Sequence, residues 1–131
     1  MGRLAGMGVN VRRVYESRSR SRGDGVRFLV DRLWPRGVSK DTLELDRWAK
    51  EIAPSTRLRT WYGHRPERYE EFARRYHHEL KEPEAAEVLD ELRRIVRRRP
   101  ITLLTATKDV ERSAAAVLAP LLRASRGTGH R

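Results

Sequence analysis

Cysteine is absent from this 131-residue chain. The absence excludes disulfide frameworks, thiolate zinc sites, iron–sulfur clusters and cysteine nucleophiles. The four histidines also lack metal-ligand spacing, and the adjacent His77 and His78 would point roughly 100° apart on a helix. We therefore expect no structural metal and no other cofactor.

Long hydrophobic runs are missing as well. No apolar stretch approaches the ~20 residues that a membrane-spanning helix requires. The first ten residues contain no hydrophobic segment of the kind found in a signal peptide. The sequence therefore predicts a cytoplasmic protein that has no membrane partner.

Acidic residues are few compared with basic ones, and the formal net charge is +11. The charge is uneven: residues 1–40 carry +7, residues 41–92 carry −4 and residues 93–131 carry +8. A balance this basic permits nonspecific binding to nucleic acid or to anionic metabolites, but it does not determine the fold.

Three segments have the β-branched or apolar composition of strands. They are Val9–Glu16, Val26–Val30 and Ile101–Ala106. Between the first two, the polar segment Ser17–Gly25 (SRSRSRGDG) is expected to be a mobile loop.

The remaining periodic segments predict helices. Asp41–Ile52 has a helical apolar stripe, and Asp41 with Glu44 resembles a capping box. A short helix should lie between a Ser55 cap and a Gly63 stop, and another should begin at Pro66. Two further helices are expected at 84–98 and 110–122.

This order of elements predicts an α/β fold in one small domain. We expect a three-layer sandwich in which helices flank a short, mostly parallel sheet of three to four strands. A short additional strand is expected within a loop. Residues 1–8 should form a flexible leader, residues 9–123 the domain, and residues 124–131 a flexible basic tail.

Two polar segments follow predicted strands, where ligands bind in open α/β sheets. The first, residues 31–40, offers Arg32, Arg36 and Lys40 as anion ligands, with Trp34 beside them. The second, residues 105–109, adds Lys108. If the two strands are parallel, both segments open onto one crevice.

Three residues are candidates for acid–base roles. Asp31 and Asp109 could act as a base or orient one, and His64 lies on a turn, where it could donate or accept a proton. Structural alternatives stay open. Arg32 or Arg36 could pair with Asp31 or Asp46, and Trp34 could serve packing. Asp109 could cap a helix, and His64 could cap a helix or bond a backbone carbonyl.

The block Asp31–Gly37 (DRLWPRG), followed by Lys40, resembles the signature of the YeaO-like family, domain of unknown function 488. Further matching residues extend the resemblance over about residues 11–122, among them Trp48, Ala53-Pro54-Ser55, Gly63-His64, Ile101–Leu104 and Lys108-Asp109. The resemblance implies a small cytoplasmic bacterial-type α/β protein and no known reaction. Arg112 and Ser113 depart from it, because relatives often carry a His-Asn pair there.

Three functions remain open at this point. The chain could bind a small phosphate- or nucleotide-like anion at the strand ends, and could be an enzyme acting on it. It could instead be a nucleic-acid-binding module that uses its basic loops and ends, or a non-catalytic structural or adaptor protein. The sequence does not determine the oligomeric state.

Overall fold

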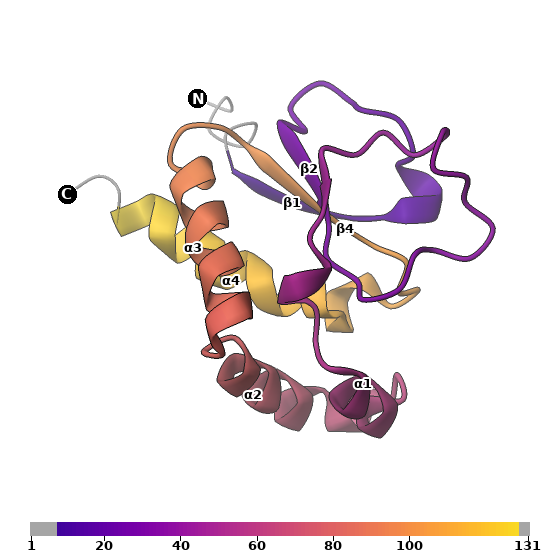
Figure 1. Ribbon diagram of the computed structural model, residues 1–131, viewed down its shortest axis with the longest axis vertical. Helices are drawn as coiled ribbons and strands as arrows, with labels where there is room; N and C mark the ends of the chain where they lie inside the picture. The colour runs from indigo at the N-terminus through magenta and orange to yellow at the C-terminus, as the bar shows by residue number, and fades with distance from the viewer. Residues whose placement is uncertain (1–7, 129–131) are drawn as a thin grey trace.

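A computed structural model describes residues 8–128 and contains one sheet of four parallel strands (Figure 1). The strands are β1 (Val9–Arg13), β2 (Val26–Leu29), β3 (Arg47–Trp48) and β4 (Ile101–Thr105), in the spatial order β1-β4-β2-β3. The prediction of a small α/β domain with a parallel sheet is confirmed. A short additional strand is present, but β3 lies within Asp41–Ile52, which was predicted to be a helix and not a loop.

The four α-helices are α1 (Thr56–Tyr62), α2 (Tyr69–Glu79), α3 (Pro83–Val96) and α4 (Ala114–Thr128). The predicted limits of α1 are confirmed: the Ser55 hydroxyl accepts the Leu58 N–H at 3.1 Å, and Gly63 ends the helix with φ +53°. Pro66 begins a 3-10 turn that leads directly into α2.

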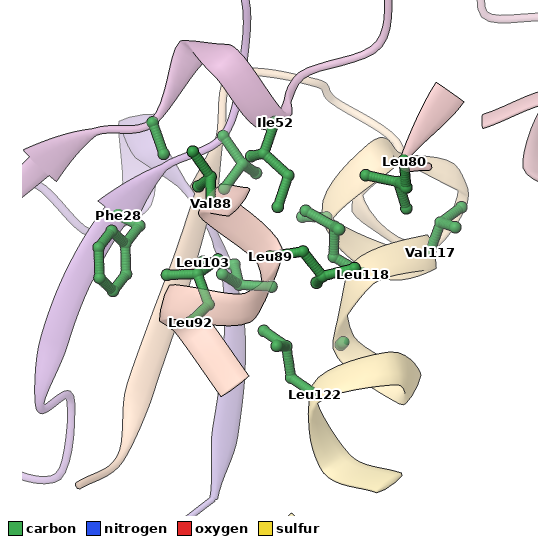
Figure 2. Close-up of a cluster of buried hydrophobic side chains, with 14 of the residues drawn as sticks. Phe28, Ile52, Leu80, Val88, Leu89, Leu92, Leu103, Val117, Leu118 and Leu122 are labelled. Carbon is green, nitrogen blue, oxygen red and sulfur yellow. The ribbon is translucent and has the colours of Figure 1, made fainter. Parts of the chain in front are cut away.

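The core lies on the face of the sheet that α3 and α4 cover. Phe28 and Leu103 are register partners on the neighbouring strands β2 and β4. Both belong to the buried cluster that includes Leu89, Leu92 and Leu118 from the helices (Figure 2). Because successive strand residues point to opposite faces, Leu29 and Leu104 lie on the other face.

An irregular segment rather than a helix covers this second face (Figure 1), where Val38 and Leu43 pack with Leu29 and Leu104. The predicted helix over Asp41–Ile52 is therefore wrong. The Glu44 N–H donates to the Arg18 carbonyl at 2.8 Å, so no capping box forms. Residues 47–48 instead pair with β2, because covering and extending the sheet outweighs the local helical pattern.

The loop 17–25 is fixed, contrary to the expectation of mobility. The fully buried Arg27 side chain donates to the Asp24 carboxylate at 2.8 Å and to the Ser17 carbonyl at 2.5 Å. The Arg20 guanidinium binds the Gly25 carbonyl at 2.6 Å and Asp46 at 3.0 Å. These contacts fasten both ends of the loop, so it is not a free basic arm.

The last helix differs from its prediction at both ends. Residues 110–112 form a 3-10 turn, and α4 begins at Ala114 because the Ser113 hydroxyl accepts the Ala116 N–H at 3.2 Å. The helix continues through residues 124–128, where we expected a flexible tail. Most of the predicted leader (1–7) and the end of the tail (129–131) lie outside the described residues. No helix in the described part has the length and hydrophobicity to cross a membrane.

Candidate functional site

A cavity of about 830 Å³ lies at the carboxyl ends of β2 and β4, beside α1. Segments 31–36, 106–109 and 113–114 line it, together with Tyr15, Pro54, Arg59, Tyr62, His64 and Phe72. The two polar segments that follow the strands therefore open onto one crevice, as the parallel arrangement required. This volume is in the range of pockets that hold small organic ligands.

Asp31 joins the ends of the two central strands. One carboxylate oxygen accepts the Thr105 hydroxyl at 2.8 Å, and the other accepts the Ala106 N–H at 2.7 Å. Burial raises the pKa of Asp31 above its ordinary value, although these two bonds and the nearby Arg59 and His64 oppose the shift. Each oxygen of the Asp31 carboxylate therefore already accepts a hydrogen bond within the protein.

Arg32 holds a different part of the wall. Its guanidinium donates from Nε to the Pro54 carbonyl at 3.0 Å and from Nη2 to the Ala53 carbonyl at 3.1 Å. No ion pair forms between Arg32 and Asp31, and Asp46 is bound by Arg20 and by the Arg27 N–H instead. Arg32 thus fixes the loop before α1, and two of its five N–H donors are used in these bonds.

Three other cations face the cavity without such partners. Arg36 follows β2, Arg59 lies on α1, and Lys108 follows β4; all three are exposed. Within residues 8–128, no carboxylate lies at ion-pair distance from any of them. Guanidinium and ammonium groups arranged around one cavity can bind phosphate or carboxylate oxygens.

His64 also lines the cavity and has an unusual backbone. Its φ of +57° makes it the one non-glycine residue in the left-handed region within the described chain. This conformation costs roughly 1–2 kcal/mol for a residue with a Cβ. The exposed imidazole lies beside Tyr62, with ring centroids 6.3 Å apart. The turn after α1 therefore places the His64 imidazole at the cavity, and the backbone of His64 is strained in this position.

Trp34 lines the cavity but serves packing. Its indole N–H donates to the Val38 carbonyl at 2.7 Å, and its ring meets Trp48 edge-on at 5.4 Å. Lys40 is not brought to the cavity lining; its ammonium lies 5.6 Å from the Trp34 ring centroid. The predicted anion ligands are therefore divided: Arg36 and Lys108 line the cavity, whereas Lys40 does not and lies over the Trp34 ring.

Asp109 lines the cavity, but its carboxylate pairs with the Arg112 guanidinium at 3.0 Å. It occupies the residue before the 3-10 turn without making a side-chain cap, so the capping explanation is wrong. The Arg112 carbonyl accepts the Tyr62 hydroxyl at 2.7 Å, and burial raises the pKa of Tyr62. Arg112 and Ser113, which depart from the family pattern, are thus occupied in fixing the start of α4.

The sequence reasoning did not identify Arg59, Tyr62 or Tyr15 as parts of the site. Helical spacing places Arg59 and Tyr62 on one face of α1, next to the turn that carries His64, and this signal was available. Tyr15 lay inside the predicted strand Val9–Glu16, but β1 ends at Arg13, so the strand-end rule did not select Tyr15. Its hydroxyl donates to the Arg36 carbonyl at 2.7 Å.

Metal ligands do not gather in this part of the molecule. Among the residues that the structure describes, no group of three or more histidine, aspartate or glutamate side chains is placed to hold a metal ion. The chemistry that the cavity offers is therefore that of its cations, its imidazole and its aromatic walls.

Comparison with known proteins gives matches along almost the whole chain. A family model described as the inactive DUF488-N3 subclade matches residues 8–128. An uncharacterised protein of Mycobacterium tuberculosis is 51% identical over 114 residues, which cover 87% of this chain and 92% of that protein. The uncharacterised protein YeaO of Escherichia coli is 42% identical over 119 residues, covering 89% and 98% of the two chains. No solved structure matches significantly.

Proposed function

The chain belongs to the YeaO-like DUF488 family, and we propose that it binds a small phosphate- or carboxylate-bearing ligand without converting it. One observation carries the proposal: Arg36, Arg59 and Lys108 come from three separate parts of the chain to one cavity, and no carboxylate in the described chain lies at ion-pair distance from them. Unpaired cations in a concave site attract and orient an anion.

The carboxylates of the cavity do not cancel this charge. Asp109 is neutralised by Arg112, and the Asp31 carboxylate is shielded by the two hydrogen bonds it accepts. The two arginines and the lysine would therefore attract an anionic ligand more strongly than the two engaged carboxylates would repel it. The mixture of guanidinium forks and one ammonium group suits an oxyanion with several oxygens.

The proposal that no conversion takes place rests on how the two aspartates are held. A general base must lie within hydrogen-bond reach of the proton that it removes. The Asp31 carboxylate is directed at Thr105 and Ala106, where each oxygen accepts one hydrogen bond, and Asp109 is held in its ion pair. The matching subclade is described as inactive, which supports the same conclusion. The cytoplasm remains the proposed location.

Thermal denaturation with a panel of anions tests this proposal. Sulfate, phosphate, citrate and sugar phosphates would be added at low and at physiological salt. A ligand at 100 times its Kd should stabilise the protein by about 2.7 kcal/mol, which moves the Tm of a domain this size by several degrees. A shift that survives physiological salt and disappears in Arg36→Ala is expected. If no anion shifts the Tm in the parent protein, the proposal is wrong.

Nucleic-acid binding is the second candidate function, because Arg97, Arg98 and Arg99 form an exposed run in the loop before β4. This loop precedes β4, so it lies at the opposite end of the sheet from the cavity. Binding there should weaken steeply as salt rises, since each neutralised phosphate releases a counterion. An oligonucleotide whose affinity falls when Arg97 and Arg98 are both changed to alanine, but not in Arg36→Ala, would favour this candidate.

A further inference from the structure

The cavity is much larger than an isolated oxyanion. One water molecule occupies about 30 Å³ in the liquid, so a five-atom phosphate fills only a small part of about 830 Å³. The remaining lining is largely apolar and aromatic, and includes Leu33, Trp34, Pro35, Tyr62 and Phe72. A ligand matched to this space therefore carries a bulky apolar group in addition to its anionic group.

Leu33 is the clearest part of that apolar lining. It is 60% exposed, and no other large hydrophobic side chain within residues 8–128 is similarly exposed. It lies between the clamped Arg32 and Trp34, in the loop that leaves β2. Both neighbours are fixed by hydrogen bonds to backbone carbonyls, so the loop holds Leu33 out at the cavity rather than folding it into the core.

The aromatic walls are rigid. Tyr62 stacks on Phe72 with ring centroids 4.2 Å apart and an interplanar angle of 14°. Trp34 is held by its hydrogen bond to Val38 and by its edge contact with Trp48. Side chains fixed in this way do not need to be ordered when an aromatic ligand enters the cavity, which favours binding.

From this combination we propose that the ligand is a phosphomonoester that carries an aromatic ring, as a nucleoside monophosphate does. The inference rests on the proposed function, because Arg36, Arg59 and Lys108 would hold its phosphate. Leu33 would cover the ring and determine the preference for an aromatic group. The phosphate group is attracted by the three cations, and the apolar lining favours this ligand over smaller anions that have no ring.

Isothermal titration calorimetry with matched ligands tests the inference. The probes are adenosine monophosphate, phenyl phosphate and ribose 5-phosphate, which share the phosphate and differ in the ring. Burying an exposed leucine against a ring should tighten binding by about tenfold. We therefore expect both aromatic esters to bind about tenfold more tightly than ribose 5-phosphate.

Two variants separate the contributions. Leu33→Ser should remove most of the aromatic preference and leave ribose 5-phosphate affinity unchanged, whereas Leu33→Met should retain the preference. Lys108→Ala should weaken the binding of all three ligands by a similar factor. Because Leu33 and Lys108 are exposed, neither change should disturb folding.

The outcomes distinguish the two levels of the proposal. Equal affinities for the aromatic and the ribose esters would overturn the inference and leave the anion-binding function in place. A preference that Leu33→Ser does not change would also overturn it. Failure of all three esters, together with no response to sulfate or citrate, would overturn the proposed function itself.

Discussion

The carboxylate of Asp31 accepts the hydroxyl of Thr105 at 2.8 Å, across 74 residues of sequence. This bond links Asp31, in the cavity lining after β2, to the last residue of β4. The Thr105 hydroxyl also accepts the Thr107 N–H at 3.1 Å, so it orders the start of the loop that carries Lys108. The cavity thus depends on a bridge between two strand ends.

Replacing Thr105 with valine should break this bridge without changing the shape of the side chain. We expect a loss of about 1–2 kcal/mol in the free energy of unfolding. The pKa of Asp31 should rise further, because the Thr105 bond now lowers it. Carboxyl-carbon NMR titration measures that pKa. Thr102→Val is the matched control: Thr102 is buried on the same strand and donates to the Asp24 carbonyl at 2.8 Å, so it should cost stability without changing Asp31.

The raised pKa of Asp31 predicts a specific dependence of stability on pH. Its cause is chiefly burial, which disfavours the charged carboxylate. The folded protein therefore retains this proton at pH values where the unfolded chain, with a pKa near 3.8, has lost it. This contribution is fully present below the unfolded pKa and is lost as pH rises through the folded pKa.

The variant Asp31→Asn isolates that contribution. Unfolding by guanidinium chloride, measured from pH 3.5 to 7 for both proteins, should show the parent losing stability relative to the variant as pH rises. A difference between the two proteins that stays constant over this range, or that changes in the parent's favour, would contradict the assignment.

The buried pair Asp24–Arg27 predicts a large and asymmetric effect on stability. Both side chains are fully buried, and the guanidinium also binds the Ser17 and Glu44 carbonyls. Arg27→Met removes the buried partner of Asp24 and leaves the carboxylate with Arg12 at 3.7 Å and the Ser21 N–H at 2.8 Å, so it should cost about 3 kcal/mol. The double variant Asp24→Asn with Arg27→Met should lose less than the single variant. Chemical denaturation checks both, and equal losses would show that the pairing itself is unimportant.

Alanine substitutions at two glycines with similar backbone angles should lower the free energy of unfolding by different amounts. Gly25 and Gly37 have φ values of +63° and +77°, so alanine at either position adds strain of roughly 1–2 kcal/mol. At Gly25 the new Cβ would lie 1.9 Å from the Pro100 carbonyl oxygen, whereas at Gly37 nothing lies within 4 Å. Gly25→Ala should therefore cost at least about 3 kcal/mol, once the overpacking is included. Thermal unfolding of the two variants tests this difference. Equal losses in Tm would contradict the close contact between residue 25 and the Pro100 carbonyl oxygen.

Two lysines predicted alike from the sequence should behave differently. Lys108 lines the cavity, whereas Lys40 does not, and its ammonium lies over the Trp34 ring. Lys108→Ala should weaken phosphate binding by about tenfold, the usual value of one charged hydrogen bond. Lys40→Ala should leave it within twofold of the parent. Titration calorimetry measures both, and a larger effect at Lys40 would place the anion elsewhere.

The sequence predicted those parts of the fold that local patterns determine. The apolar strands β2 and β4 and the Ser55 and Gly63 boundaries of α1 were found because composition and capping act over a few residues. The shared crevice followed from the parallel strands. The segment Asp41–Ile52 was misassigned because its apolar stripe fits both a helix and a cover for the second face of the sheet. Only the tertiary contacts of Leu43 decide between them.

Side-chain partners account for the rest. Nothing near Asp31 in the sequence indicates that Thr105 and Ala106 occupy its oxygens, since both partners come from a distant strand. Similarly, the SRSRSRGDG loop resembles a free arm until Arg27 is seen to bind Asp24 and Ser17 from the sheet. Contacts between distant elements therefore determine which of the predicted site residues face a ligand.

The most direct test of the central claim is to map the anion by NMR. Phosphate would be titrated into isotope-labelled protein at physiological salt while the backbone amide signals are followed. Saturable shifts are expected only in residues 31–36, 63–64 and 106–109, and the side chains of Arg36 and Arg59 should respond as well. Shifts concentrated instead at Arg97–Arg99, or small shifts that never saturate, would contradict an anion site at the carboxyl ends of the strands.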